Sequence, residues 1–189
     1  MENQKSNWYG RKIIALFLIC FVFLAKAQNV TLDELINLRK HDLAYVEEYL
    51  AKKGWVYLST IEYGIVFTNP SISNNRVTVA IIIYRYYADD IKTLQISTNN
   101  TNKYLSYVDR IKSFGCKLID SYEEKETGIV KEYRGATTTF IVTNEGYTNV
   151  DIFDYFEEYG YDVNKNFYTI GIFSNDDYDI IQMIKKQAK

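Results

Sequence analysis

Few residues of this chain are of the types that carry nucleophilic or metal-centred chemistry. The sequence contains one histidine, His41, and two cysteines. A zinc site needs three or four nitrogen, sulfur or carboxylate ligands, and a Ser-His or Cys-His nucleophile needs a histidine beside it. His41 precedes Asp42, but adjacent helical residues point about 100° apart and do not face each other. We therefore expect His41 to be a solvated cation near a helix end, not a general base.

Cys116 follows Gly115 at the start of an expected strand and alternates there with Leu118. A reactive thiol needs a neighbouring base or a helix N-terminus that lowers its pKa. The only histidine lies far upstream and belongs to no supporting motif. We therefore predict a buried, structural thiol at this position.

The densest group of candidate ligands is acidic. Between positions 145 and 179 nine acids stand against one base, Lys165. Calcium binds oxygen-rich clusters, but the spacing of a calcium-binding loop does not occur here, and we expect no metal site. A glycosidase needs two facing carboxylates, and pairs such as Asp151 and Glu158 are too numerous to single one out. The acids are Glu145, Asp151, Asp154, Glu157, Glu158, Asp162, Asp176, Asp177 and Asp179.

Tyrosine is the most informative residue type. The chain has 18 Tyr, and one apolar segment, Val77–Tyr87, ends in Tyr84, Tyr86 and Tyr87. Tyrosine gives a large amphipathic contact area at low entropic cost and is enriched at binding surfaces. On a sheet face that no helix covers, four rings would form a platform for a peptide, glycan or protein. They are Tyr57, Tyr63, Tyr84 and Tyr86. The alternative is that tyrosines merely cover a solvated sheet face.

The first 27 residues have the charge order of a secretory signal peptide. Three basic residues precede an unbroken apolar run, Ile13–Leu24, and small residues at 25 and 27 precede Gln28. A helix of that length reaches about 18 Å, short of the roughly 30 Å hydrocarbon core, which disfavours a transmembrane anchor. A lipoprotein leader would use Cys20, but bulky residues precede it. We expect cleavage between Ala27 and Gln28.

Removal of this leader changes the composition of the chain that folds. Residues 28–189 hold 18 Lys and Arg against 23 Asp and Glu, a net charge of −5, and 17 tyrosines. They keep one cysteine, so no internal disulfide can form and a hydrophobic core must hold the fold. We expect no nucleic-acid partner, because an acidic chain lacks the basic face that a phosphate backbone requires. We also expect no cofactor.

Helical periodicity follows a capping box at Thr31–Glu34 and stops at Gly54. This segment is either one helix or two, the second capped by Asp42. A further helix is expected at 103–114 before Gly115, and a last one after Ser174 or Asn175.

Between the helices the hydrophobic period is two, which predicts strands. Turn residues at Asn69–Asn75 separate the second strand from the third, and such short connections make the strands antiparallel. The expected strands are 55–60, 61–68, 77–87, 91–98, 116–123, 129–134, 137–143, 150–156 and 167–173.

The two halves of the chain resemble each other. The segment Leu43–Glu48 before Gly54 parallels Leu105–Arg110 before Gly115, and each is followed by strands. The predicted fold class is α+β in two similar lobes, each a helix or helix pair packed on an antiparallel β-meander. The predicted domains are the signal peptide 1–27, a first lobe 28–100, and a second lobe 101–189 with a C-terminal helix.

The leader, the segment from Thr31 to Trp55 and the strands rich in Tyr and Asn resemble short uncharacterised secreted proteins of Bacteroidetes. This resemblance implies a Gram-negative envelope and no particular activity. The repeated helix and meander are similar in architecture to the β-lactamase inhibitory protein, a tandem-repeat secreted inhibitor. That protein's repeats carry disulfides, which residues 28–189 cannot form, so the likeness is one of architecture alone.

These observations favour a non-catalytic binding protein of the periplasm or the extracellular space. It would recognise a protein or an extracellular ligand through the tyrosine-rich sheet face, at Tyr57, Tyr63, Tyr84 and Tyr86. The alternatives are a periplasmic hydrolase that uses paired carboxylates and a structural component of an envelope assembly.

N-terminal sequencing of the exported protein should begin at Gln28, because the small residues before it suit signal peptidase. A cytoplasmic species that retains Met1 and is the only form in the cell would contradict the predicted leader.

Overall fold

A computed structural model of the protein describes residues 30–73, 76–87, 91–125, 127–146, 162–163 and 166–187. The predicted leader and the expected strand at 150–156 lie outside these residues. The described helices are α2 (Leu32–Leu38), α3 (Leu43–Lys52), α4 (Thr101–Ser113) and α6 (Asn175–Gln187). The described strands are β1 (Val56–Ile61), β2 (Gly64–Ser73), β3 (Arg76–Tyr86), β4 (Lys92–Thr98), β5 (Lys117–Glu124), β6 (Gly128–Arg134), β7 (Thr138–Gly146), β8 (Asp162–Val163) and β9 (Phe167–Ser174).

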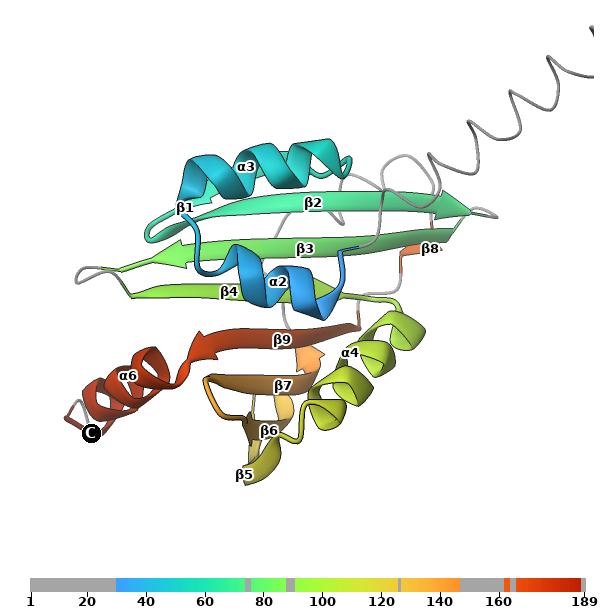
Figure 1. Ribbon diagram of the computed structural model, residues 1–189. Coiled ribbons are helices and arrows are strands. Elements are labelled where there is room, and N and C mark those ends of the chain that lie inside the picture. The colour runs from blue at the N-terminus through green and yellow to red at the C-terminus, as the bar shows by residue number, and fades with distance from the viewer. Residues whose placement is uncertain are drawn as a thin grey trace, which may run out of the picture.

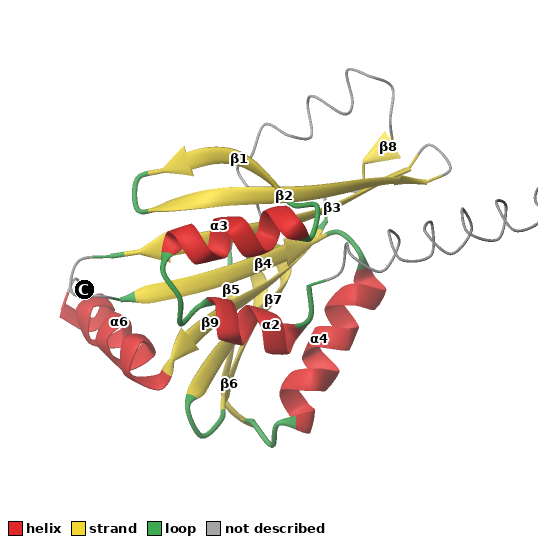
Figure 2. Cartoon of the chain, turned by 45° about the horizontal axis from the view of Figure 1, so that its top comes forward, coloured by secondary structure: helices red, strands yellow, loops and turns green. Residues whose placement is uncertain are grey.

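All these strands belong to one sheet. Eight follow the order β1-β2-β3-β4-β9-β7-β6-β5, and every pair along that order is antiparallel. The short β8 pairs with β3 in parallel. Figures 1 and 2 show α2, α3 and α4 on one face of the sheet and α6 beyond one end of it. The predicted α+β fold class is confirmed.

The strands do not divide into the two lobes that the sequence suggested. β4 pairs with β9 at the centre of the sheet, from Leu94 opposite Ile172 to Thr98 opposite Tyr168. Had the two meanders stayed apart, β4 and β9 would each have been an edge strand with unpaired backbone groups. Their pairing removes both edges, and one continuous sheet results.

The two ends of this sheet repeat the same features. Counted outward from the centre, each half runs from the last strand of a meander to its first, β4 to β1 and β9 to β5. The glycine after the preceding helix has a positive φ in both halves, 77° at Gly54 and 73° at Gly115. The register of the outermost strand then shifts around Leu58 in β1 and around Ile119 in β5. Both shifts come four residues after the glycine.

α2 and α3 begin directly after the residues that the sequence predicted as caps. Thr31 and Glu34 form the capping box of α2. The Asp42 carboxylate accepts a hydrogen bond of 2.9 Å from the backbone N–H of Tyr45 at the start of α3. The N-terminal helical segment is therefore two helices, because Asp42 satisfies a backbone donor that a continuous helix would have used internally.

The second strand is longer than the sequence indicated. β2 continues through Asn69 and Pro70 to Ser73, although these residues were expected to form a turn. The pairing of β1 with β2 ends where Val56 faces Thr68. Beyond that point β2 has no β1 neighbour on its outer side, so the missing N–H of Pro70 breaks no pair with β1.

Apolar side chains are buried on both faces of the sheet. On the helix-covered face, α2, α3 and α4 bury Leu35, Leu50 and Ile111 against strand residues such as Ile82 and Ile172. The opposite face holds a second buried cluster, made of Val66, Val79, Ile81, Ile83 and Phe167. Burial on both faces explains why β3 is an aliphatic run and not an alternating pattern.

Hydrogen bonds to a buried carboxylate connect α6 to the sheet. Glu132 of β6 is 3% exposed and accepts hydrogen bonds from the hydroxyls of Tyr122 on β5 and Tyr178 on α6. Arg134 adds a bidentate pair with Asp179, with N–O distances of 2.7 and 2.8 Å. These contacts hold α6 at the second half of the sheet.

Glu34 should make folding stability depend on acid pH. Burial would raise its pKa, but hydrogen bonds from Lys53, the Thr31 N–H and Tyr49 outweigh burial and lower it from 4.5 to about 2. Stability from this carboxylate is present above pH 4.5 and is lost as the pH falls towards 2. After discounting for solvent screening it amounts to about 1–2 kcal/mol.

The variant Glu34→Gln should therefore be less stable at neutral pH and lose less stability between about pH 5 and pH 2, measured by urea unfolding. Glu47→Gln, at an exposed position of α3, is the control and should keep the parent's acid dependence. An unchanged acid dependence in Glu34→Gln would contradict the assignment.

Candidate functional site

The four tyrosines predicted to form a platform do not lie together on an open face. Tyr57, Tyr63 and Tyr86 are 59%, 50% and 43% exposed, whereas Tyr84 is 1% exposed. Tyr84 packs in the core beneath the helices, and its hydroxyl donates to the backbone carbonyl of His41 at 2.9 Å. The expected exposure of Tyr84 is wrong, because the face of β3 that carries it is the face that α2 and α3 cover.

The other predicted chemical groups occupy structural positions. The His41 ring stacks on Tyr45, with ring centroids 3.9 Å apart, and Asp42 is engaged as the cap of α3. Cys116, predicted to be buried, is partly buried against the core, and burial raises the pKa of its thiol. A raised pKa leaves less thiolate, so it weakens this residue as a nucleophile.

The acidic segment is only partly within the described residues. Asp177 pairs with Arg39 at 3.2 Å, and Asp179 pairs with Arg134. The side chains of the acids from Glu145 to Asp162 lie outside the described part. Among the side chains that the structure does describe, no three potential metal ligands gather in one place.

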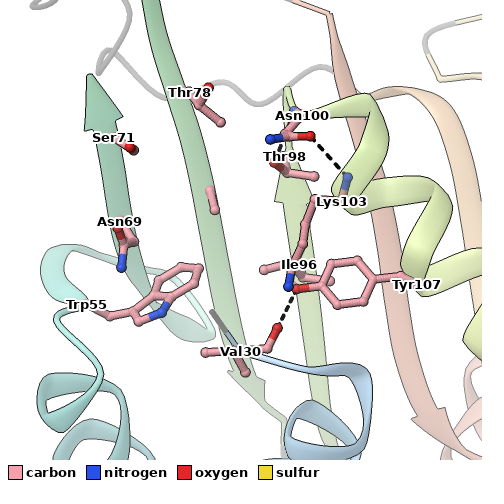
Figure 3. A pocket seen from close by; sticks show the side chains of 11 residues that line it. Val30, Trp55, Asn69, Ser71, Thr78, Ile96, Thr98, Asn100, Lys103 and Tyr107 are labelled. Carbon is pink, nitrogen blue, oxygen red and sulfur yellow. Dashed lines mark hydrogen bonds between the residues drawn. The ribbon is translucent and has the colours of Figure 1, made fainter. Parts of the chain in front are cut away.

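The strongest candidate site is a pocket of about 230 Å³ on the helix-covered face, which we call the Trp55 pocket (Figure 3). Its floor is formed by β2, β3 and β4, at the end of the sheet where β2 extends beyond β1. The start of α4, the residue after Gly54 and Val30 form its walls. The lining residues are Val30, Trp55, Asn69, Ser71, Thr78, Ala80, Ile96, Thr98, Asn100, Lys103 and Tyr107.

The end of α3 places the indole of Trp55 in this pocket. The backbone N–H of Trp55 donates to Leu50 and that of Gly54 donates to Ala51, both at 3.0 Å. These two bonds form a Schellman motif, which requires the left-handed backbone that glycine tolerates. The chain therefore reverses at Gly54 and directs Trp55 against the sheet.

Two of the residues that line the pocket each have a buried donor atom with no hydrogen-bond partner among the described groups. They are the indole Nε1–H of Trp55, which is 4% exposed, and the amide Nδ2 of Asn69, which is 9% exposed. In Figure 3 the Asn69 amide points toward the Trp55 ring. Leaving a buried donor unpaired costs about 1–3 kcal/mol. A ligand that brings hydrogen-bond acceptors to these two donors would remove that cost.

Lys103 adds a charge at the opposite wall. Of the described residues that line the pocket, Lys103 alone is charged. Its ammonium lies 5.0 Å from the centroid of the Tyr107 ring. Burial lowers the pKa of Lys103, an effect that Glu34 partly opposes and Lys53 reinforces. Lys103 lies in the first turn of α4, where the helix dipole favours anions.

The remaining polar groups of the pocket are largely engaged. The Tyr107 hydroxyl donates to the Val30 carbonyl at 2.7 Å. The Asn100 side-chain oxygen accepts from the Lys103 backbone N–H, and the Thr98 hydroxyl accepts from the Asn100 backbone N–H. The groups left over are therefore mainly donors, which suit a ligand rich in hydrogen-bond acceptors.

A second pocket, of about 280 Å³, lies at the matching place in the other half of the sheet. There Cys116 follows Gly115 as Trp55 follows Gly54, and Gly135 stands where Asn69 stands in the first half. This Cys116 pocket is lined by Asp33, Ile36, Phe114, Cys116, Gly135, Ala136, Thr137, Thr138 and Phe140. The residues at the matching positions thus supply neither an indole nor an amide donor.

Sequence reasoning missed the Trp55 pocket. Its main residues lie on separate elements and come together only through β-pairing and the packing of α4. One local signal was available, since Lys103 is a cation in a helix turn where carboxylates are favoured. A single unfavourable charge cannot identify a pocket without the contacts that surround it.

Comparisons with protein-family models, with curated proteins and with solved structures find no match to this chain. Among the described helices, none has the length and apolar character that crossing a membrane requires.

Replacing the buried Tyr84 and the exposed Tyr86 of β3 should have different effects on the free energy of unfolding. Tyr84→Ala should lower the free energy of unfolding by about 3–4 kcal/mol, because it leaves a cavity and an unpaired carbonyl. Tyr86→Ala, two residues on, should cost about 1 kcal/mol or less. Urea unfolding of both variants measures the difference, and equal effects would contradict the placement of Tyr84 in the core.

Proposed function

We propose that the protein is a non-catalytic binding protein that holds a small ligand, or one end of a larger one, in the Trp55 pocket. The observation that carries the proposal is the pair of unpartnered buried donors, Trp55 Nε1–H and Asn69 Nδ2, in a pocket that also contains a lysine. Ligand sites characteristically combine an apolar lining with a few convergent polar groups.

The lining suits binding better than catalysis. The pocket has an ammonium and several hydroxyls and amides, but the described lining residues offer no carboxylate, imidazole or thiol to act as a general base. The hydrolase alternative needs two facing carboxylates. Neither described pocket has such a pair, since the Cys116 pocket has Asp33 alone.

We keep the proposal that the binding protein is exported and acts in the periplasm or the extracellular space, with the leader 1–27 as its support. We also propose that the two halves of the chain are a tandem repeat. The matched glycines, the matched register shifts and the identical strand order in the two halves support this interpretation.

A panel of small molecules tests the binding function. It should include carboxylates, amides, sugars, amines and inorganic phosphate, each scored by the melting temperature of the protein. A ligand at 100 times its Kd adds about 2.7 kcal/mol, which raises the Tm of a chain this long by roughly 5 °C or more. At least one class should produce such a shift.

One variant fills the pocket without removing a polar group, and a matched control carries the same substitution away from the pocket. Ala80→Leu adds volume at the floor and should abolish the shift, whereas Ala51→Leu on the exposed side of α3 should preserve it. If Ala80→Leu is not folded by circular dichroism, the smaller Ala80→Val takes its place. A panel without any hit, or hits that survive the blocking variant, would refute this function.

A further inference from the structure

We infer that the ligand of the Trp55 pocket presents a carboxylate, held by the Lys103 ammonium, the Trp55 indole N–H and the Asn69 amide. This inference rests on the proposed binding function and names its ligand class. The three groups are all donors, and they come from three separate elements: α4, the residue before β1, and β2.

The donor set matches a carboxylate in type. A carboxylate has two oxygens with about four acceptor sites and no donor. The indole N–H is a donor only, and the ammonium carries three donors and no acceptor. A ligand that brought its own N–H or O–H groups to this wall would leave buried donors facing donors, which costs binding free energy.

The positive charge of Lys103 favours an anionic ligand over a neutral hydrogen-bond acceptor. Lys103 is the one charged side chain among the described lining residues. Glu34 acts on Lys103 from outside the lining, and its carboxylate already pairs with Lys53 at 2.6 Å. Hydrogen bonds between charged partners are roughly twice as strong as neutral ones. An anion would also favour the protonated form, which burial disfavours at Lys103. The N-terminus of α4 adds its dipole in the same sense.

The rest of the lining determines the body of the ligand. Ile96, Val30 and Ala80 give apolar contact, and the rings of Trp55 and Tyr107 give flat walls. At about 230 Å³ the pocket is below the usual range of drug-sized sites, roughly 300–1,000 Å³. It therefore suits a short aliphatic or single-ring acid, or the C-terminal residue of a peptide.

The Cys116 pocket provides an internal comparison. It is of similar size and lies at the matching place, but it is lined by Asp33 and by no lysine or arginine among its described residues. Asp33 is paired with Arg110 at 2.9 Å, so the described lining of this pocket offers a carboxylate no cation. Of these two pockets, the inference thus assigns a carboxylate site to the one in the first half of the sheet.

Matched acid and amide pairs test the inference on the full chain carrying Trp8→Phe, so that Trp55 is the only indole. The probes are benzoate with benzamide, acetate with acetamide, and N-acetylalanine with its amide. The indole ¹H–¹⁵N cross-peak of Trp55 is followed during each titration. At least one acid should move this peak saturably and bind about 10- to 100-fold more tightly than its amide.

The source of the carboxylate follows from which pair responds best. Preference for N-acetylalanine over benzoate and acetate indicates a peptide C-terminus, and the reverse preference indicates a free small acid. Both results support the inference, because the recognised chemistry is the same.

Charge removal on one helix supplies the decisive variants. Lys103→Met should weaken binding of the acid about 10- to 100-fold and leave the amide unchanged. Lys112→Met, on the same helix but exposed, should bind as the parent does. Trp55→Phe should also weaken binding of the acid. Because this variant has no Trp55 indole signal, its binding is measured by the shift in melting temperature.

The outcomes separate this inference from the proposed function. Amides that bind as tightly as acids, or equal losses for acid and amide in Lys103→Met, overturn the carboxylate while the binding function stands. If no acid moves the Trp55 peak but another compound class raises the Tm, the carboxylate is again refuted and the function survives. If no compound of either set binds, both fail.

Discussion

The pairing of β4 with β9 is the contact on which the rest of the structure depends. β4 ends the first meander and β9 ends the second, so each would be an edge strand if the two halves folded separately. On one face Leu94 and Ile96 pack with Ile170 and Ile172. On the other, the hydroxyls of Ser97 and Thr169 lie 2.9 Å apart. This junction of β4 with β9, which we call the seam, is thus paired through its backbone and packed on both faces.

This seam also determines where α4 can lie. The helix begins directly after β4, with Asn100 as its cap, and its buried residues Tyr107 and Ile111 pack on the sheet. Its first turn therefore stands over the end of β2, β3 and β4, where β1 has not yet begun. Lys103 and Tyr107 close a space there that Trp55 closes from the other side. The Trp55 pocket is a consequence of where one helix must start.

Local features of the fold were predictable from the sequence. The capping box at Thr31, the cap at Asp42, and the glycine stops at Gly54 and Gly115 are set by contacts within a few residues. Such contacts depend on side-chain chemistry and spacing alone. The expected strands therefore lie within a few residues of the observed ones wherever the structure describes them.

Features that depend on distant contacts were not predictable. Tyr84 looks like surface because tyrosine is amphipathic, but the covering helices and the carbonyl of His41 make it a core residue. Pro70 looks like a turn, but the short β1 leaves room for it in β2. Donors without partners cannot be recognised until every neighbour is known, so Trp55 and Asn69 carried no signal in the sequence.

A crystal structure of the protein grown with benzoate would locate the atoms of a bound carboxylate. We expect a planar ligand in the Trp55 pocket with its carboxylate oxygens about 2.7–3.2 Å from the donor atoms of Trp55, Asn69 and Lys103. Ordered water alone at these donors, or a benzoate whose ring and not its carboxylate faces them, would contradict it.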